Sequence, residues 1–224
     1  MRKEYARRAD VAGSDERYSA SNPAYRWMLA NRQTAVVEFL ERFEVSDLSK
    51  LRILEIGCGS GGVLQEFISL GAEPLNIYGV DLLHDRLRVA KEGLPNSALA
   101  TANGQHLPFP SNAFDLVVQF TAFSSILENS IKEAMSTEIM RVLKPGQGFL
   151  WYDFIWNPLN RQTRGISLSE VRKLFPTTDI TSRRITLAPP LSRFLIPRFQ
   201  HLADVLARFS FLKSHLIIWI QKPN

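Results

Sequence analysis

Residues 51–62 read Leu-Arg-Ile-Leu-Glu-Ile-Gly-Cys-Gly-Ser-Gly-Gly. The apolar start is typical of a buried β-strand, and it runs directly into glycines at 57, 59 and 61. Because glycine lacks Cβ, such a turn can bend sharply and bring bare backbone against a ligand. A helix that begins near Ser60 would point its free amide groups at the same ligand. The stretch therefore predicts a strand–turn–helix corner that binds a nucleotide-like molecule.

The turn alone leaves two kinds of ligand open. Gly57, Gly59 and Gly62 satisfy the dinucleotide fingerprint Gly-x-Gly-x-x-Gly, and Asp81 follows about twenty residues later, where an acidic residue holds ribose hydroxyls. The remaining segments of the chain must decide between a dinucleotide and another adenosine-containing cofactor.

Five segments, in order, resemble the motifs of class I S-adenosylmethionine (SAM) methyltransferases. They are Glu55-x-Gly57-x-Gly59-x-Gly61 and residues 76–81, 103–109, 114–120 and 138–148, which together span about residues 50 to 154. A nicotinamide dehydrogenase would not be expected to carry the Leu-Pro-Phe segment at 107–109 or the Arg-Val-Leu-Lys-Pro-Gly segment at 141–146. The resemblance implies a methyltransferase that uses SAM as its cofactor.

From Leu51 onward, predicted strands and helices alternate, which favours an α/β fold with a mostly parallel sheet and helices on both faces. The strands are expected at 52–56, 77–80, 98–102, 115–120, 148–154, 180–187 and 215–221. Helices are expected at 63–70, 82–93 and 167–174, and from a Ser130/Glu133 capping box to residues 144–146. An earlier helix begins at Asn22-Pro23 and runs to Phe43. The resemblance implies a Rossmann-like, seven-stranded sheet whose last strand is antiparallel and lies beside the fifth.

A chain of 224 residues is long enough for one well-packed domain with appendages. Residues 1–45 are expected to form a polar N-terminal segment and a capping helix, and residues 46–224 the SAM-methyltransferase domain. Within it, the core motifs occupy 50–154 and the acceptor-side region 155–213.

The net charge of +5 and the pI of about 9.5 are compatible with nucleic acid, anionic lipid or a phosphorylated substrate, and equally with solubility alone. Cys58 is the only cysteine, so no intrachain disulfide can form. No apolar run reaches the roughly twenty residues that span a bilayer, and the basic N-terminus is not followed by a secretory signal. We therefore expect a cytoplasmic protein.

The resemblance assigns cofactor roles to residues at the ends of the strands. It implies that Glu55 organises the methionine amino group, that the glycines at 57, 59 and 61 contact the ribose and amino acid, and that Asp81 binds the ribose diol. Leu82 and His106 would flank the adenine. Asn103 stands where the family usually has aspartate, which predicts a weaker contact with the adenine amino group. Gly104, Gln105 and Gln119 complete the predicted cofactor set.

Two residues at the same sheet edge are candidates for a catalytic base or an orienting group: Asp153 at the end of the fifth strand and His215 at the start of the last. A buried, hydrogen-bonded aspartate and a strand-end histidine are the structural alternatives. Arg161 and Arg164 could hold an anionic group of the substrate or could simply be solvated. No metal site is predicted, because the chain has only four histidines and no cluster of the catechol-methyltransferase type.

The acceptor is less well defined by the sequence. Residues 119–122 read Gln-Phe-Thr-Ala, which argues against the enzymes that methylate amino groups and carry Asn-Pro-Pro-aromatic at this place. Segments 151–154, 157–158, 164–166 and 187–190 look like a bacterial subgroup associated with polysaccharide biosynthesis. That resemblance implies O-methylation of a small molecule or glycan precursor.

Two other functions stay open. The positive charge is compatible with an RNA methyltransferase, although nucleic acid is not the expected partner because no appended RNA-binding module is visible. Residues 193–213 mix Leu, Ile and Phe with Arg and Lys, as helices at membrane surfaces do, which would suit peripheral membrane contact or a non-catalytic adaptor. We expect this apolar face instead to be buried against the last two strands. The sequence leaves the oligomeric state undetermined.

Overall fold

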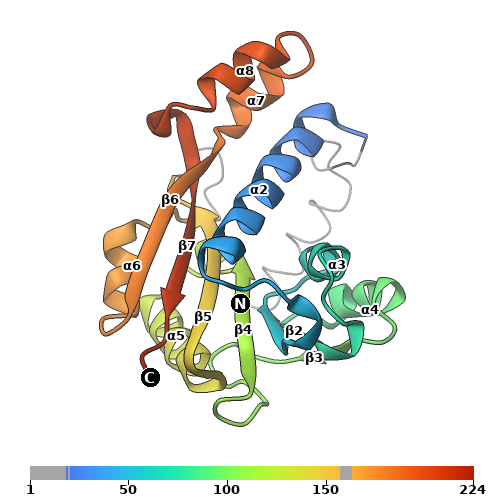
Figure 1. The fold of residues 1–224 in the computed structure, drawn as a ribbon, viewed down its shortest axis with the longest axis vertical. Helices are drawn as coiled ribbons and strands as arrows, with labels where there is room; N and C mark the ends of the chain where they lie inside the picture. The colour runs from blue at the N-terminus through green and yellow to red at the C-terminus, as the bar shows by residue number, and fades with distance from the viewer. Residues whose placement is uncertain (1–18, 20, 157–162) are drawn as a thin grey trace.

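The centre of the computed structural model, which describes residues 19, 21–156 and 163–224, is a seven-stranded sheet (Figure 1). The strands are β1 (Ile53–Ile56), β2 (Ile77–Asp81), β3 (Ala98–Thr101), β4 (Phe114–Phe120), β5 (Leu143–Phe154), β6 (Asp179–Leu187) and β7 (Lys213–Gln221). Their order is β3-β2-β1-β4-β5-β7-β6. β1 to β5 pair in parallel, whereas β7 is antiparallel to both β5 and β6. The predicted fold class, including the last strand beside the fifth, is confirmed.

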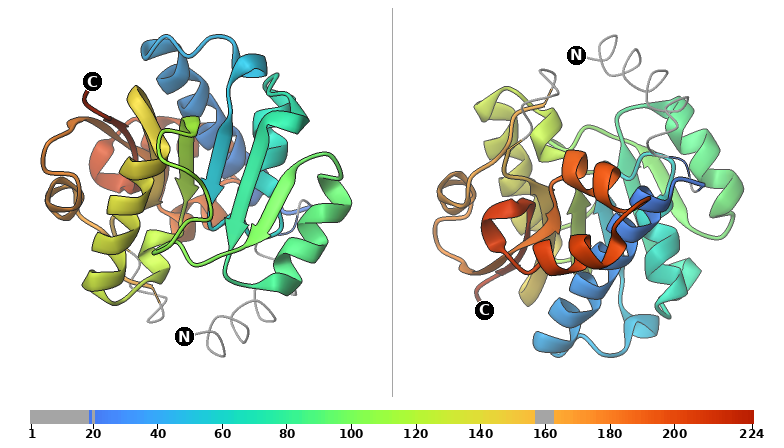
Figure 2. Two further views of the ribbon diagram at one scale, coloured as in Figure 1. Left: turned by 90° about the horizontal axis from the view of Figure 1, so that it is seen from below. Right: turned by 90° about the horizontal axis from the view of Figure 1, so that it is seen from above.

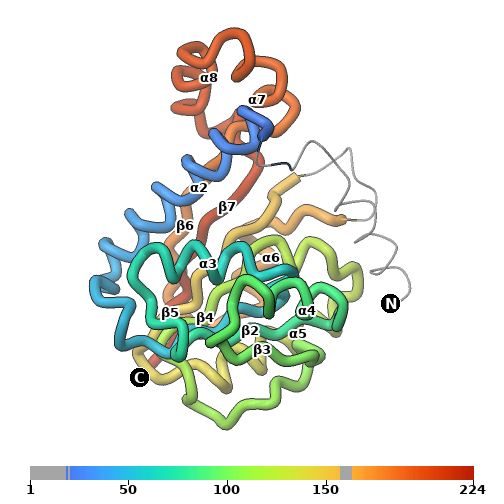
Figure 3. Tube along the Cα trace, turned by 90° about the vertical axis from the view of Figure 1, so that its right-hand side faces the viewer, coloured from blue at the N-terminus to red at the C-terminus, as the bar shows by residue number. Residues whose placement is uncertain are grey.

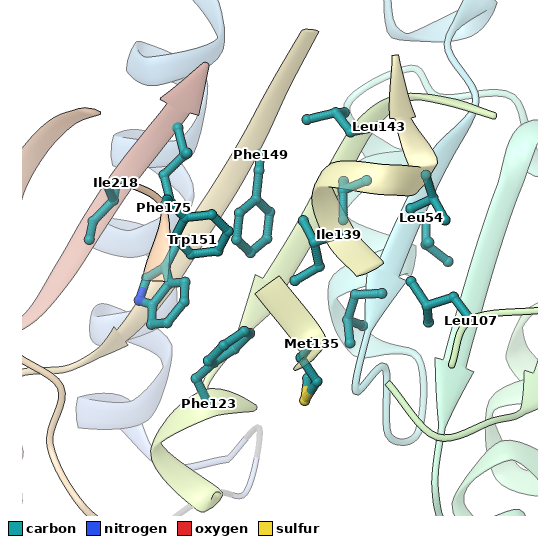
Figure 4. Packing of buried hydrophobic residues seen from close by; sticks show 14 of the residues in the cluster. Leu54, Leu107, Phe123, Met135, Ile139, Leu143, Phe149, Trp151, Phe175 and Ile218 are labelled. Carbon is teal, nitrogen blue, oxygen red and sulfur yellow. The ribbon is translucent and has the colours of Figure 1, made fainter. Parts of the chain in front are cut away.

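Helices cover both faces of the sheet (Figure 2). On one face lie α5 (Asn129–Val142) and α6 (Leu168–Leu174), and on the other lie α2 (Pro23–Arg42), α3 (Gly62–Ser69) and α4 (His84–Gly93). Trp151, Phe149 and Phe175 form the aromatic part of the core under α5 and α6 (Figure 4). Burial of these two apolar layers is the main force that holds the strands and helices together.

Side chains along β5 alternate between the two faces, and this alternation decides which residues can reach the site. Trp151 packs on the α5 side, whereas Tyr152 packs on the α2 side. In the antiparallel pairing of β5 with β7, His215 lies opposite Phe154 and therefore shares the face of Tyr152. Asp153 lies opposite Leu216 and points to the other face.

The first residues of the helices show where the predicted N-terminal capping agrees with the structure and where it does not. The Asn22 side chain accepts hydrogen bonds from the amides of Ala24 and Tyr25, and Pro23 occupies the first turn, so the predicted start of α2 is confirmed. The Ser130/Glu133 capping box is wrong, because α5 already begins at Asn129 and no side chain caps it.

The predicted end of α5 at 144–146 is also too late. The helix ends at Val142 and the chain passes directly into β5. Pro145 disfavours a helical conformation at Lys144. The ammonium of Lys144, on the extended chain, contacts the Asp115 carboxylate at 2.6 Å.

The segment after Leu187 contains more regular structure than the sequence indicates. The structure forms two short helices there, α7 (Pro189–Leu195) and α8 (Gln200–Leu206), with Pro197 between them, where the sequence analysis assigned no helix. They lie at one end of the molecule, near the N-terminal end of α2 (Figure 3). Among the described residues, no helix combines the length and apolar character that a membrane span requires. Of the predicted polar N-terminal segment, residues 1–18 and 20 lie outside the described residues.

Candidate active site

A cavity of about 1800 Å³ opens at the carboxyl ends of β1, β2 and β4. The strand order reverses between β1 and β4, and open parallel sheets bind their ligands at this point. One side of the cavity is formed by the turns after β1 and β2. The other side is formed by α2, β5, β7 and the start of α7.

The structure brings most, but not all, of the predicted site residues to this cavity. Those that line it are Glu55, Gly57, Gly59, Asp81, Leu82, Asn103, Gly104 and His215. Gly61, Gln105, His106, Gln119 and Asp153 are not among the lining residues.

The turn after β1 requires glycine at two positions for different reasons. Gly57 has a φ of +75°, and a Cβ there would lie 2.8 Å from the Cβ of Ala122. Gly61 has a φ of +83° and begins α3, where a Cβ would lie 2.6 Å from Leu94. Gly57 therefore keeps the cavity wall close to β4, whereas Gly61 allows α3 and α4 to pack together.

Asp81, at the end of β2, is held by the backbone around it. Its Oδ2 accepts a hydrogen bond from the Gly59 amide at 2.9 Å, and its Oδ1 accepts one from the Leu83 amide at 2.9 Å. A carboxylate offers about four acceptor sites in all. The two remaining sites can accept hydrogen bonds from the two hydroxyls of a ribose.

Glu55 is the clearest sign that the cavity takes a ligand. The side chain is buried and its Oε2 has no hydrogen-bond partner among the described residues. Burial raises the pKa of this carboxyl well above its usual range, although the Arg32 charge opposes that rise. A buried oxygen without a partner is costly. A cationic or N–H-bearing ligand group at this place would remove that cost.

The remaining predicted cofactor residues shape the rim. Asn103 accepts a hydrogen bond from the Gln105 amide at 3.1 Å and donates to the Gln105 side chain at 3.1 Å. His106 is exposed outside the cavity. Gln119 is buried and accepts a hydrogen bond from the Ala122 amide at 2.9 Å, so it fixes the turn after β4.

Comparison with known proteins agrees with this geometry. Residues 53–146 match the family described as "Methyltransferase domain". The chain is 29% identical over 116 residues to a ubiquinone/menaquinone biosynthesis C-methyltransferase from Cupriavidus taiwanensis, a match that covers 49% of this chain and 46% of that protein. A sterol 4-C-methyltransferase from Caenorhabditis elegans is 31% identical over 121 residues, covering 51% and 34%. The chain thus spans about half the length, or less, of these relatives.

Solved structures show the same fold. A phosphoethanolamine N-methyltransferase from Haemonchus contortus, in complex with SAM, superposes with a TM-score of 0.64 at 21% identity, covering 90% of this chain and 56% of that one. Residues 53–146 are a class I SAM-dependent methyltransferase domain. Its cofactor fits the site, because the unpartnered Glu55 oxygen and the Gly57 turn, which a Cβ would fill, suit an amino group and close backbone contact.

The cavity is also lined by a cation that the sequence analysis missed. Arg32, on α2, forms an ion pair with Glu66 and lies 5.2 Å and 5.7 Å from the ring centres of Phe120 and Tyr152. It interrupts an apolar stripe that runs from Met28 to Val36, and a charged residue in such a stripe is the signal that could have identified it. Its position near Glu55 suits a carboxylate of the ligand.

His215 lines the acceptor side of the cavity, opposite the glycine turn that follows β1. Its ring stacks on Tyr152 with a centre separation of 4.8 Å, and its Nδ1 lies 3.0 Å from the Ser214 hydroxyl. Burial, helped by the Arg32 charge, lowers the pKa of His215 to about 3. The imidazole is therefore neutral at physiological pH and can accept a hydrogen bond from an acceptor hydroxyl.

Asp153 is not among the residues that line the cavity, and it lies on the opposite side of β5 from Tyr152. Its carboxylate accepts hydrogen bonds from the amides of Ser124 at 3.0 Å and Phe154 at 2.8 Å. Burial raises its pKa to about 6, which these hydrogen bonds oppose. The structure thus gives Asp153 a supporting role under the turn after β4, which was the structural alternative to a base.

The two arginines considered for substrate binding do not form part of this wall. Arg164 pairs with Glu170 at 2.5 Å, and neither residue lines the cavity. Arg161 lies outside the described residues. The cations that do line the acceptor side are Arg184, Arg193 and Lys213, none of which was predicted.

Proposed function

We propose that this protein transfers a methyl group from SAM to a hydroxyl of a small molecule, or of a glycan precursor, that carries an apolar body. The observation that supports this is the continuity of one cavity from the unpartnered Glu55 oxygen to the aromatic wall around His215. SAM supplies a methyl group that is already activated on a positively charged sulfur. The protein's task is then mainly to align the acceptor.

The residues of the chain divide this task. Glu55 and Asp81 offer carboxyl groups at two points of the cofactor side, and Arg32 extends toward them from α2 with a positive charge. Phe120, Tyr152 and their neighbours keep water away from the path between the two ligands. His215 accepts a hydrogen bond from the acceptor hydroxyl and fixes its lone pair toward the cofactor side.

The low basicity of His215 restricts which kinds of acceptor hydroxyl the site can methylate. An imidazole with a pKa near 3 is a poor base for an ordinary alcohol. A phenol or enol, whose own pKa is about 10 as in tyrosine, loses its proton far more readily. We therefore favour a hydroxyl attached to an aromatic or enolic system.

The acceptor side is too apolar for a bare sugar. Most of its wall consists of Met28, Leu29, Phe120, Tyr152, Phe154, Ile155, Trp156, Pro189, Pro190, Leu191, Phe211 and Leu212. A free sugar would lose water from those of its hydroxyls that face these apolar side chains without gaining partners from them. Methylation of a glycan precursor is consistent with this wall when the glycan is attached to an apolar carrier, and the nearby cations suit a phosphate in such a linkage.

A second candidate acceptor atom is a ring carbon. The curated relatives named above are C-methyltransferases by name. A phenolate or enolate, formed when the hydroxyl loses its proton to solvent, can react at carbon as well as at oxygen. After attack at carbon, the methylated carbon loses its own proton to solvent and the oxygen regains one, so one proton is released in either outcome. The site of methylation on the product distinguishes the two.

Calorimetry with SAM and with its demethylated product tests the cofactor part of the proposal. We expect a dissociation constant in the micromolar range, equivalent to about −8 kcal/mol. Absence of heat with both compounds would refute it. Incubation with labelled SAM and a panel of prenylated phenols, simple phenols and free sugars tests the acceptor part, with NMR locating the new methyl group. Transfer only to free sugars would contradict the assigned acceptor class.

A further inference from the structure

The segment that contains α7 and α8 exposes an unusual number of large apolar side chains. The described residues include ten exposed large hydrophobic side chains, and six of them lie in this one segment: Phe194, Phe199, Leu202, Val205, Phe209 and Phe211. Phe194 is 62% exposed and Phe211 is 73% exposed. We call residues 193–213 the α7–α8 surface. Such a concentration of apolar side chains on one surface indicates a contact with another protein or with a membrane, whereas scattered single residues would not.

The apolar face is not buried against the last strands, contrary to the expectation from the sequence. Only Leu195, Ile196 and Ala203 of this segment pack fully inside, in a small cluster with Ala24 and Leu187. Leu202 and Val205, three residues apart, point outward on one side of α8. Leu206 and Leu212 pack partly against the same cluster, whereas the six large side chains named above stay exposed and can contact a partner.

The charge of the same surface indicates what kind of partner fits. It carries Arg193, Arg198, Arg208 and Lys213 against a single acidic residue, Asp204, so its net charge is +3 (four positive minus one negative). The Asp204 carboxylate already accepts a hydrogen bond from the Trp27 indole at 2.9 Å. A second copy of this chain would bring like charges together in a two-fold contact, which disfavours a dimer through this surface.

The position of the surface links it to the active site. Leu191, Arg193, Phe211 and Lys213 belong to α7, to the turn before β7 or to its start, and they line the cavity described above. α7 and α8 project beyond the sheet at one end of the molecule (Figures 1 and 3). A body that covered the α7–α8 surface would therefore lie next to the acceptor side of the cavity.

We propose that the α7–α8 surface docks on an anionic phospholipid bilayer. Its phenylalanines enter the boundary between headgroups and acyl chains, and its arginines contact the lipid phosphates, as in other interfacial helices. This docking goes beyond the proposed methyl transfer and needs neither cofactor nor acceptor. It would bring the acceptor side of the cavity to the source of a lipid-soluble molecule.

Vesicle flotation with the full chain, without SAM, tests the docking. We expect binding to vesicles of phosphatidylcholine with roughly one third phosphatidylglycerol, and at least roughly tenfold weaker binding to phosphatidylcholine alone. The double variant Phe199→Ser/Phe209→Ser should bind roughly tenfold or more weakly. Arg198→Gln/Arg208→Gln should bind roughly twenty-five-fold more weakly, from about a fivefold loss for each basic residue.

Two matched variants control for the number and type of changes. Leu75→Ser/Val89→Ser removes exposed apolar side chains elsewhere, and Arg88→Gln/Arg172→Gln removes exposed charges elsewhere. Both should bind vesicles like the unchanged chain, and all variants should keep their melting temperature and their affinity for SAM.

Three results would overturn the docking: no binding to anionic vesicles, equal losses in the control variants, or concentration-dependent self-association that the Phe199→Ser/Phe209→Ser variant abolishes. Loss of SAM binding or of methyl transfer with vesicle binding intact would instead count against the proposed function alone.

Discussion

The two sides of the cavity are built in different ways. The side assigned to the cofactor consists of short turns that each follow directly on a strand, after β1, β2 and β3. The acceptor side combines α2, the ends of β5 and β6, and the segment from α7 to β7, which lie far apart in the sequence. One side is therefore set by local geometry, and the other is set by how distant elements pack.

This difference has a chemical consequence. A turn between a strand end and a helix fixes backbone amides and one carboxylate within a few residues, as Gly59 and Asp81 show. The acceptor wall can change its side chains without disturbing those turns. We therefore expect variants of the first side to abolish cofactor binding, and variants of the second to leave it intact and alter turnover or acceptor choice.

The largest expected effect comes from Gly57→Val. A β-branched residue at a φ of +75° is strained by about 1–3 kcal/mol, and its Cβ would collide with Ala122. The new side chain would also enter the cavity. We expect a lower melting temperature and no SAM binding by calorimetry. Gly62→Ala is the stability control, because a Cβ at Gly62 meets nothing within 4 Å; an equal loss of stability in both variants would contradict the account.

Asp81→Ala should have the next largest effect. It removes two hydrogen-bond acceptors assigned to the ribose and also releases the amides of Gly59 and Leu83. With about 1.5–3 kcal/mol for each of two hydrogen bonds to a charged group, we expect SAM affinity to fall by at least roughly a hundredfold. Asp81→Asn keeps one acceptor oxygen and should lose less. An unchanged dissociation constant in Asp81→Ala would refute the assigned role.

The sequence predicted much of the first side of the cavity. Glu55 and Asp81 lie at the ends of strands whose apolar runs are plain in the sequence, Gly57 and Gly59 follow the first of these strands, and strand ends in a parallel sheet meet at one edge. The order of elements was predictable for the same reason, since alternating strands and helices restrict the topology. Helix boundaries were predicted less accurately, as the wrong capping box at Ser130 shows.

The second side could not be predicted in the same detail, because it depends on side-chain direction and long-range packing. Asp153 and His215 end or begin neighbouring strands, yet one residue of register places them on opposite faces of the sheet. Arg32 reaches the site only because α2 packs across β5 and β7. The sequence around each of these residues does not indicate whether its side chain faces the cavity.

His215→Leu tests whether the second side can be changed separately. We expect turnover of a phenolic acceptor to fall roughly tenfold to a hundredfold, because the hydroxyl loses its partner, while SAM affinity stays within about twofold, less than 0.5 kcal/mol. His84→Leu, an exposed change on α4, is the matched control. Equal turnover in both variants would show that His215 does not contact the acceptor. A large loss of SAM affinity in His215→Leu would show instead that the two sides are not separable.

The smallest effect concerns the pH dependence of stability, which the acceptor side should carry through His215. Its pKa falls from 6.5 to about 3 on folding, so the unfolded chain binds a proton that the folded chain does not. The stabilising contribution of the neutral ring is complete above pH 6.5 and decreases by about 1.4 kcal/mol per pH unit as the pH falls below that value. Asp153 acts oppositely, because its pKa rises from 3.8 to about 6 and its contribution to stability is lost as the pH rises through that range.

Urea unfolding of the unchanged chain, His215→Leu and Asp153→Asn at pH 7.5 and 5.5 separates the two groups. We expect His215→Leu to gain stability relative to the unchanged chain on acidification, and Asp153→Asn to lose it; parallel curves for all three would show that neither group titrates abnormally and that His215 is not held neutral by burial.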